Sequence, residues 1–194
     1  EIEQADPGLT IIHSTVAVGT TAKLRSMLPR RPIVHSPVRG PHPHLEKALR
    51  TFVKFIGADD EGAGQAAEEH LRSLGLKVRW FSPAATTELG KLLDTTYYGL
   101  CIAWHGEMER MCQRAGVCFD DAVTCWNETY NEGYKQLGWD HVVRPVLRPP
   151  AARIGGHCVI PNAGLLHEYT PGLATELVLQ YTDHGTEQGL KSGD

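Results

Sequence analysis

The sequence predicts an α/β segment followed by an all-α segment that is built on one long central helix. Over the first 83 residues, short runs of β-branched and apolar residues alternate with helical patterns, as in a sheet covered by helices. From Ala84 to Ala115, apolar residues recur in steps of three and four, interrupted only by Gly99 and Gly106. This spacing predicts a continuous helix. We therefore expect two domains, 1–83 and 84–194.

Four strands and two helices are predicted in the first segment, in the order β-α-β-β-α-β. The strands are expected over residues 9–15, 32–36, 51–56 and 76–81. The helices are expected from the turn Gly19-Thr20-Thr21 to about residue 28 and over 61–74, with Gly75 ending the second. Residues 37–44, Pro-Val-Arg-Gly-Pro-His-Pro-His, contain too much proline for either element.

Helix signals continue in the second segment. Ser82 and Pro83 are expected to cap and open the long helix, and Asp120-Asp121 to cap a second helix that ends near Leu137. Thr170-Pro171 is expected to open a third. The apolar stripe of the long helix is too long for one small domain to cover, so we expect a homodimer formed through residues 84–115.

Composition narrows the class of protein. With 194 residues, a formal net charge of −4 and no basic run, the chain is not expected to bind nucleic acid. No apolar segment is long enough for a membrane span. Five cysteines, an odd number without a disulfide-type spacing, favour a reducing, cytoplasmic compartment. The partners are expected to be small molecules or copies of the chain itself.

The candidate reactive segment is 153–162, Arg-Ile-Gly-Gly-His-Cys-Val-Ile-Pro-Asn. Two glycines allow close approach of the backbone to a ligand, and the Cys158 thiol follows them beside an imidazole. This is a plausible nucleophile loop, since a neighbouring His or a helix N-terminus favours the thiolate that reacts. The alternative is a buried structural cysteine beside a tight turn.

Three motifs carry a resemblance to a known family. They are His-Ser-Thr-Val-Ala-Val-Gly-Thr-Thr at 13–21, Thr-Glu-Leu-Gly-Lys-Leu at 87–92, and Gly-Gly-His-Cys at 155–158. In this order the sequence resembles the nucleotide-sugar dehydrogenases, the UDP-glucose/GDP-mannose dehydrogenase family of the 6-phosphogluconate dehydrogenase-like superfamily. The resemblance covers nearly the whole chain. It implies the second half of a Rossmann-like domain followed by a helical domain.

The resemblance also implies an activity: the NAD-dependent oxidation of the alcohol of a nucleotide sugar to a carboxylate, through a covalent cysteine adduct. In that scheme Cys158 looks like the nucleophile and Lys91 like the ammonium that stabilises the oxyanion. Thr15 resembles the residue that holds the water or the nicotinamide end of the cofactor. The other implied contacts are Ser14 and Gly19 for the cofactor, and Gly155, Gly156 and His157 for the substrate.

Four positions depart from the family pattern. Carboxylates of the family fall on Val38, near His42 and on Asn162, and an asparagine falls on Thr95. Hydrolysis of a thioester needs a base that activates water, and only His42 or His157 could take that role here. The alternative function is therefore a diverged, non-catalytic dimeric binding or scaffold protein of the same fold.

Binding of NAD by this chain is not expected. A dinucleotide site requires a glycine-rich first βα turn, where the pyrophosphate meets a helix N-terminus, and the sequence starts after the unit that carries it in the family. The family's C-terminal nucleotide-gripping domain is not represented either. Residues 62–67, Gly-Ala-Gly-Gln-Ala-Ala, match the letters of the glycine fingerprint, but the acidic residues 59–61 would repel a pyrophosphate.

A His/Cys metal site is the third and weakest alternative. It would combine His35, His42 and His44 with His157 and Cys158, because imidazole and thiolate suit zinc. Pro-His-Pro-His has no specific ligand spacing, so we expect no metal. The remaining cysteines are expected to pack in the core; they are Cys101, Cys112, Cys118 and Cys125.

Overall fold

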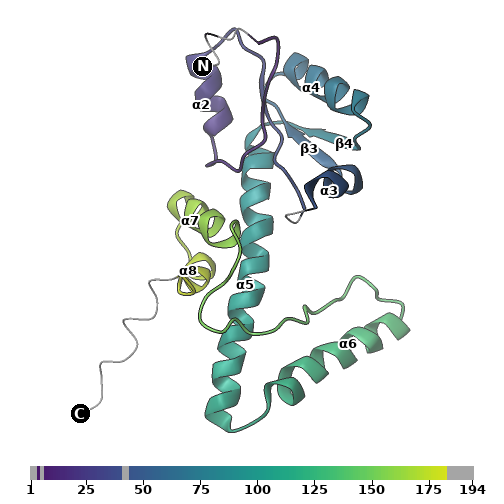
Figure 1. Cartoon of the computed structure of the whole chain (residues 1–194), viewed down its shortest axis with the longest axis vertical. Helices are drawn as coiled ribbons and strands as arrows, with labels where there is room; N and C mark the ends of the chain where they lie inside the picture. Colours follow the sequence, from purple (N-terminus) through teal and green to yellow (C-terminus); the bar gives the residue numbers. More distant parts are fainter. Residues whose placement is uncertain (1–3, 5–6, 41–43, 183–194) are drawn as a thin grey trace, which may run out of the picture. The chain divides into compact units, whose positions relative to one another are not determined.

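The computed structural model describes residues 4, 7–40 and 44–182 (Figure 1). The chain divides into two compact units, Glu1–Asp94 and Thr95–Asp194. The long helix α5, Ala85–Ala115, contributes its first turns to the first unit and the rest to the second. It confirms the predicted continuous helix.

In its described residues, the first unit contains a four-stranded mixed sheet and the helices α2, α3 and α4, besides the first turns of α5. In sheet order the strands are β1 (Thr10–Ile12), β2 (Ile33–His35), β3 (Lys54–Gly57) and β4 (Val78–Phe81). The pairs β1/β2 and β3/β4 are parallel, and β2 meets β3 in antiparallel register at His35 and Gly57. The helices are α2 (Thr20–Met27), α3 (Leu45–Thr51) and α4 (Glu61–Ser73).

Helix α4 packs on the sheet through small side chains. Its Ala63 and Ala67 join Val34 and Ile56 of the strands in the core of the unit. A Cβ on Gly64 would lie 2.5 Å from the Trp80 indole, so this glycine permits close approach of helix and strand. Figure 1 shows α2 and α4 on either side of the strands.

The structure corrects the prediction for residues 45–56. A strand was expected from Thr51, but Thr51 is the last residue of α3 and the strand begins at Lys54. Helix α3 has only seven residues, which is too short to display the apolar spacing of a helix. The other predicted strands and helices of this unit are confirmed, with ends that differ from the expected ones by at most three residues.

The second unit is helical. A π-helical turn, Asp120–Thr124, leads into α6 (Cys125–Gln136), and α7 (Val159–Tyr169) and α8 (Leu173–Leu179) follow an irregular connection. Helix α7 was not predicted. Asp120 and Asp121 lie within the first helical turn and not before it, and Thr170 ends α7 while α8 begins after Gly172. The three prolines of the connection account for its irregularity.

Both glycines within α5 are contact points for the C-terminal helices. A Cβ on Gly99 would lie 2.4 Å from a methyl carbon of Val159, and one on Gly106 would lie 2.2 Å from the Tyr181 hydroxyl. Val159 and Tyr181 join Ala103, Ala163 and Val178 in the core of this unit. The glycines therefore let α7 and α8 approach the long helix closely.

Large apolar side chains of α5 and α6 remain uncovered. Trp104 is 47% exposed, Met111 56% and Trp126 59%, and no residue of α6, all of which is described, is buried. None of the described helices is long and apolar enough to cross a membrane. The uncovered residues leave the predicted dimer face open in the single chain.

Candidate functional site

In the first unit, polar side chains gather where the strands end and α5 begins. The central group is the Glu88 carboxylate, which is buried in the first turn of α5. It accepts hydrogen bonds from the Gly19 amide (2.6 Å), the Thr21 amide (2.8 Å) and the Thr21 hydroxyl (2.7 Å). These donors form the N-terminus of α2, where the helix dipole favours a negative charge. Glu88 therefore joins two of the three sequence motifs.

The preceding residue, Thr87, holds His35 at the end of β2. His35 Nε2 lies 3.1 Å from the Ser14 carbonyl oxygen, and Nδ1 lies 2.8 Å from the Thr87 hydroxyl. Burial lowers the pKa of His35 below its usual value, against opposing effects of the Ser14 hydrogen bond and Glu88. In the neutral ring Nε2–H donates to Ser14, because a carbonyl can only accept. Nδ1 is then an acceptor and shares the single Thr87 hydroxyl proton with the Ala84 carbonyl, which lies 3.0 Å from the Thr87 oxygen. This fixes the loop after β1.

A buried lysine fixes the loop after β2. The Lys54 ammonium donates to the carbonyl oxygens of Ser36 (2.6 Å) and Pro37 (2.9 Å). Burial, and next the charge of Lys91, lower the pKa of Lys54 to about 8, because both disfavour the ammonium form. The segment that carries Val38 and Arg39 thus leaves the sheet in a defined direction.

Carboxylates of the chain itself occupy the N-termini of α2, α4 and α5. Glu88 caps α2; Asp60 accepts from the Ala63 amide of α4 (2.8 Å), and Asp59 accepts from the Ala84 amide at the start of α5 (2.9 Å). A dinucleotide pyrophosphate needs such a terminus to be open. These three helix ends therefore do not fit it, and the predicted role of Ser82 as the cap of α5 is filled by Asp59.

In the second unit, Cys158 is the N-cap residue of α7 and its side chain is exposed. Its carbonyl accepts the first bond of the helix, from the Asn162 amide (3.0 Å). Gly156 adopts φ +94°, a conformation that favours glycine, two residues before the thiol. Pro161 lies in the first turn of α7, where its missing N–H costs no helical bond.

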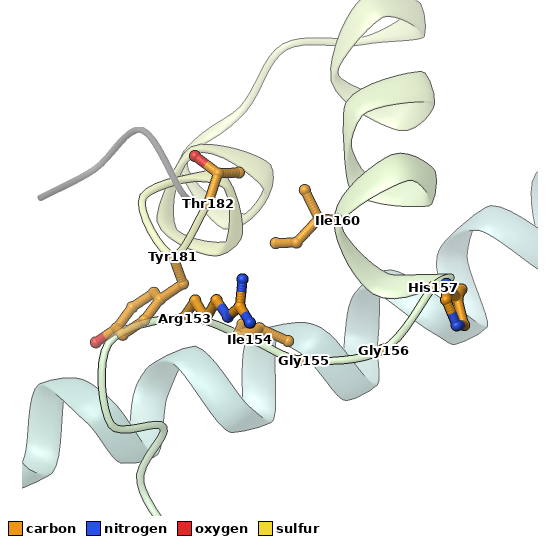
Figure 2. A pocket seen from close by; sticks show the side chains of 8 residues that line it. All are labelled: Arg153, Ile154, Gly155, Gly156, His157, Ile160, Tyr181 and Thr182. Atoms are coloured by element: carbon orange, nitrogen blue, oxygen red, sulfur yellow. The ribbon is translucent and has the colours of Figure 1, made fainter.

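A pocket of about 530 Å³ lies beside this loop (Figure 2). Gly155, Gly156 and His157 line it together with Arg153 and Tyr181. In Figure 2 the segment from Arg153 to His157 runs alongside α5 into α7. The Ile154 amide donates to the Tyr181 carbonyl (3.1 Å), which ties the loop to the end of α8. Arg153 and His157 supply basic groups to a concave surface that is large enough for a small-molecule ligand.

The predicted site residues fall into two groups. Ser14, Thr15, Gly19 and Lys91 belong to the first unit, and Gly155, Gly156, His157 and Cys158 belong to the second. His42 lies outside the described residues. The side-chain nitrogen Nδ2 of the buried Asn162 has no hydrogen-bond partner among the described residues. Among those residues, no three His, Cys, Asp or Glu side chains are grouped so that they could hold a metal ion.

The fold is that of the C-terminal part of a Rossmann-like domain followed by a helical region. Comparison with known proteins confirms the resemblance to the nucleotide-sugar dehydrogenases. The chain is 29% identical to the UDP-N-acetyl-D-mannosamine dehydrogenase of Pyrococcus horikoshii over 168 residues, which are 81% of this chain and 37% of the relative. The UDP-N-acetyl-D-mannosamine dehydrogenase of Methanococcus vannielii is 26% identical to the chain over 163 residues, which are 84% of this chain and 35% of the length of that relative.

The solved structure of UDP-D-ManNAc dehydrogenase from Pyrococcus horikoshii shares the fold, with a TM-score of 0.71 at 24% identity. The match covers 89% of this chain and 42% of that structure. No model of a known protein family matches the sequence. The chain spans about a third of the length of the curated relatives it matches.

Several residues of these sites were not found from the sequence. Lys54 had a detectable signal, because a lysine at the start of the apolar run Phe-Ile-Gly is unusual in a buried strand. Arg39 and Tyr181 had no such sequence signal, because the residues that they contact belong to other segments of the chain. Glu88 was quoted within a motif, but its role as the cap of α2 depends on a contact 67 residues away in sequence.

The cap of α2 can be tested by replacing Glu88 with Gln. Both oxygens of the Glu88 carboxylate accept hydrogen bonds from α2. In Gln one of these oxygens is replaced by an NH₂ group, which is itself a donor, so at least one of the three hydrogen bonds is lost. We expect the free energy of unfolding to fall by about 1–3 kcal/mol, measured by urea denaturation followed by circular dichroism. Glu69→Gln, on the exposed face of α4, is the matched control and should change it by less than about 0.5 kcal/mol. Equal effects of the two substitutions would contradict the cap.

Proposed function

We propose that this chain carries the reactive thiol of an NAD-dependent nucleotide-sugar oxidoreductase that converts a sugar alcohol to a carboxylate through a cysteine adduct. The observation that carries the proposal is the position of Cys158. Its thiol is exposed at the N-cap of α7, directly after two residues that line the 530 Å³ pocket. Residues 1–83 would form the cofactor-side domain and 84–194 the helical domain.

The step assigned to this chain is capture of an aldehyde. The Cys158 sulfur forms a bond to the aldehyde carbon, and the electron pair of the C=O double bond moves to oxygen. The resemblance to the nucleotide-sugar dehydrogenases supports Lys91 as the ammonium proposed to stabilise such an oxyanion. Amide N–H groups of the first turn of α7 are oriented toward the N-cap, where they favour negative charge on sulfur and oxygen. Gly155, Gly156 and His157 are proposed to contact the sugar.

Few residues of this chain are proposed to contact the cofactor. NAD would supply the hydride acceptor, but the capped ends of α2, α4 and α5 do not fit its pyrophosphate. Ser14 and Thr15 remain the proposed contacts for the nicotinamide end. Gly19 can contribute only through its turn, with φ +90°, because its amide is donated to Glu88. No reaction step is assigned to NAD within these residues.

A second candidate is a non-catalytic dimeric scaffold of the same fold. Val38 favours it, because this half-buried side chain cannot accept a proton where the family pattern has a carboxylate. Loss of the base would impair hydrolysis of a thioester without preventing the thiol from forming an adduct. The two candidates therefore differ in the reactivity of Cys158.

Limiting iodoacetamide at pH 7 separates these candidates. Cys118 and Cys125 were expected in the core, but both are exposed, as is Cys158. Exposure alone therefore predicts similar labelling of the three. We expect Cys158 to react severalfold faster than the other two, measured by mass spectrometry of the adducts, because the N–H groups at the N-terminus of α7 and the adjacent His157 stabilise the transition state of attack by its sulfur. His157→Asn should slow Cys158 by about two- to fivefold, and the exposed His141→Asn should not. Uniform labelling of the three thiols would support the scaffold.

The proposal includes a homodimer through 84–115 in a reducing, cytoplasmic compartment. The five cysteines are all free thiols, as such a compartment permits. Tyr97, Trp104 and Met111 of α5 are between 47% and 62% exposed, and a second copy of α5 would cover them. Each such side chain contributes about 1.5–3 kcal/mol when it passes from full exposure to full burial, so covering the exposed part of each favours association.

Trp104→Asp tests the dimer by analytical ultracentrifugation. Trp104 is half exposed in the single chain, so the charge is tolerated unless another chain covers it. We expect the wild type to sediment as a dimer and the variant as a folded monomer with an unchanged circular dichroism spectrum. Leu74→Asp, at an exposed site at the end of α4, should leave the dimer intact. A monomeric wild type would defeat this part of the proposal.

A further inference from the structure

A second, smaller pocket lies entirely within the first unit. It has a volume of about 210 Å³ and is lined by Arg39, Phe55, Phe81, Lys91 and Asp94, among others. Pockets for drug-sized ligands are about 300–1,000 Å³. This pocket is therefore suited to a single ring with its substituents and not to a whole nucleotide sugar.

Two aromatic rings give the pocket an apolar wall. Phe55 of β3 and Phe81 of β4 meet edge to face, with centroids 5.3 Å apart. In the register of the two parallel strands Phe55 lies opposite Arg79 and Phe81 lies opposite Gly57, so the rings form a diagonal pair on one face of the sheet. A flat or ring-shaped molecule can bury its apolar face against such a wall.

Arg39 gives the pocket an anion-binding group. Its guanidinium lies 4.5 Å from the centroid of Phe55 and 5.7 Å from that of Phe52, and it makes a weak hydrogen bond to the Val53 carbonyl (3.3 Å). Among the described residues, no carboxylate lies within ion-pair distance of it. A guanidinium has five N–H donors in a rigid fork. A half-buried, stacked arginine without an acidic partner is well placed to bind a carboxylate or phosphate from outside.

The remaining charges of the pocket lining agree with an anionic ligand. Lys91 adds a second cation, against the single carboxylate of Asp94. Lys54 lies close enough to Lys91 for their charges to influence each other. Glu88, the other nearby acid, is occupied by the N-terminus of α2. The balance of charge around the pocket is therefore positive.

We infer that this pocket binds a small ring-bearing acid, with the acidic group held by Arg39 and the ring against Phe55 and Phe81. This inference rests on the proposed function for the nature of the ring, which would be a sugar. It assigns to Arg39 the binding of the carboxylate that the proposed oxidation produces, so that the acid product is held more tightly than the neutral sugar from which it is made. The binding itself requires neither NAD nor turnover, so it can be tested separately from the proposed reaction.

The test is an NMR titration of the ¹⁵N-labelled chain with D-glucuronate, D-glucose and D-glucose 6-phosphate. We expect glucuronate to shift the amide signals of Phe55, Gly90 and Lys91 and to bind at least tenfold more tightly than glucose. Arg39→Met should weaken glucuronate binding at least tenfold, and Arg39→Lys should weaken it less, because it keeps the charge but loses the fork. Arg72→Met is the matched control, since Arg72 lies on α4 in an exposed pair with Glu68.

The outcomes of the titration decide whether Arg39 holds the acidic group of the ligand. Equal binding of glucose and glucuronate, or unchanged affinity in Arg39→Met with its amide spectrum intact, would overturn the inference. Binding of the phosphate ester but not of glucuronate would overturn its carboxylate part and assign phosphate as the acidic group. If Arg39→Met does not fold, Arg39→Lys alone must weaken binding for the inference to stand. Slow or uniform labelling of Cys158 alongside tight glucuronate binding would reject the proposed reaction and keep the pocket.

Discussion

The contact on which the first unit depends is the Glu88 carboxylate at the N-terminus of α2. It joins the turn that follows β1 to the first turn of α5 through three charge-assisted hydrogen bonds, all of them buried or partly buried. Such bonds are stronger than neutral ones and are costly to leave unmade. Because Thr87 precedes Glu88 and Lys91 follows one turn later, the same contact places the His35 partner and the proposed catalytic lysine. The motif Thr-Glu-Leu-Gly-Lys therefore has a structural role besides the chemical role that is proposed for Lys91.

The occupied helix ends also change the interpretation of the glycine-rich sequences. Gly19 and residues 62–67 both lie where a helix begins, which is the position that a dinucleotide fingerprint requires. In each case an acid of the chain takes the place that a phosphate would occupy: Glu88 at α2 and Asp60 at α4. Asp59 does the same at α5 and also pairs with Arg25 of α2 (3.4 Å). Three acids thus tie the connections of this unit together.

The sequence predicted the elements whose signal is local and long enough. Helices α4 and α5 show apolar periodicity and the strands show β-branched runs, and the structure confirms them. Helix α3 is too short for such a signal. Helix α7 follows a glycine turn and contains Pro161, so the sequence of this segment resembled a loop. Gly99 and Gly106 looked like weak points of α5, yet they are where α7 and α8 approach it.

The sites could be predicted only where one segment carries them. The Gly-Gly-His-Cys loop and the lysine motif are contiguous in sequence, so Cys158 and Lys91 could be proposed without a structure. Arg39 and Phe55 could not, because their pocket is assembled from two strands, a loop and a helix. Lys54 acts through carbonyl oxygens of Ser36 and Pro37, and backbone acceptors have no sequence signature.

The central claim is that the acids of this chain fill the helix ends that a dinucleotide would need. Calorimetric titration of the chain with NAD tests it most directly, because the pyrophosphate supplies much of the anchoring of a dinucleotide. The account predicts no measurable heat of binding at NAD concentrations up to about 1 mM, a limit of roughly −4 kcal/mol. Saturable binding with micromolar affinity would contradict it and would show that another part of the chain holds the pyrophosphate.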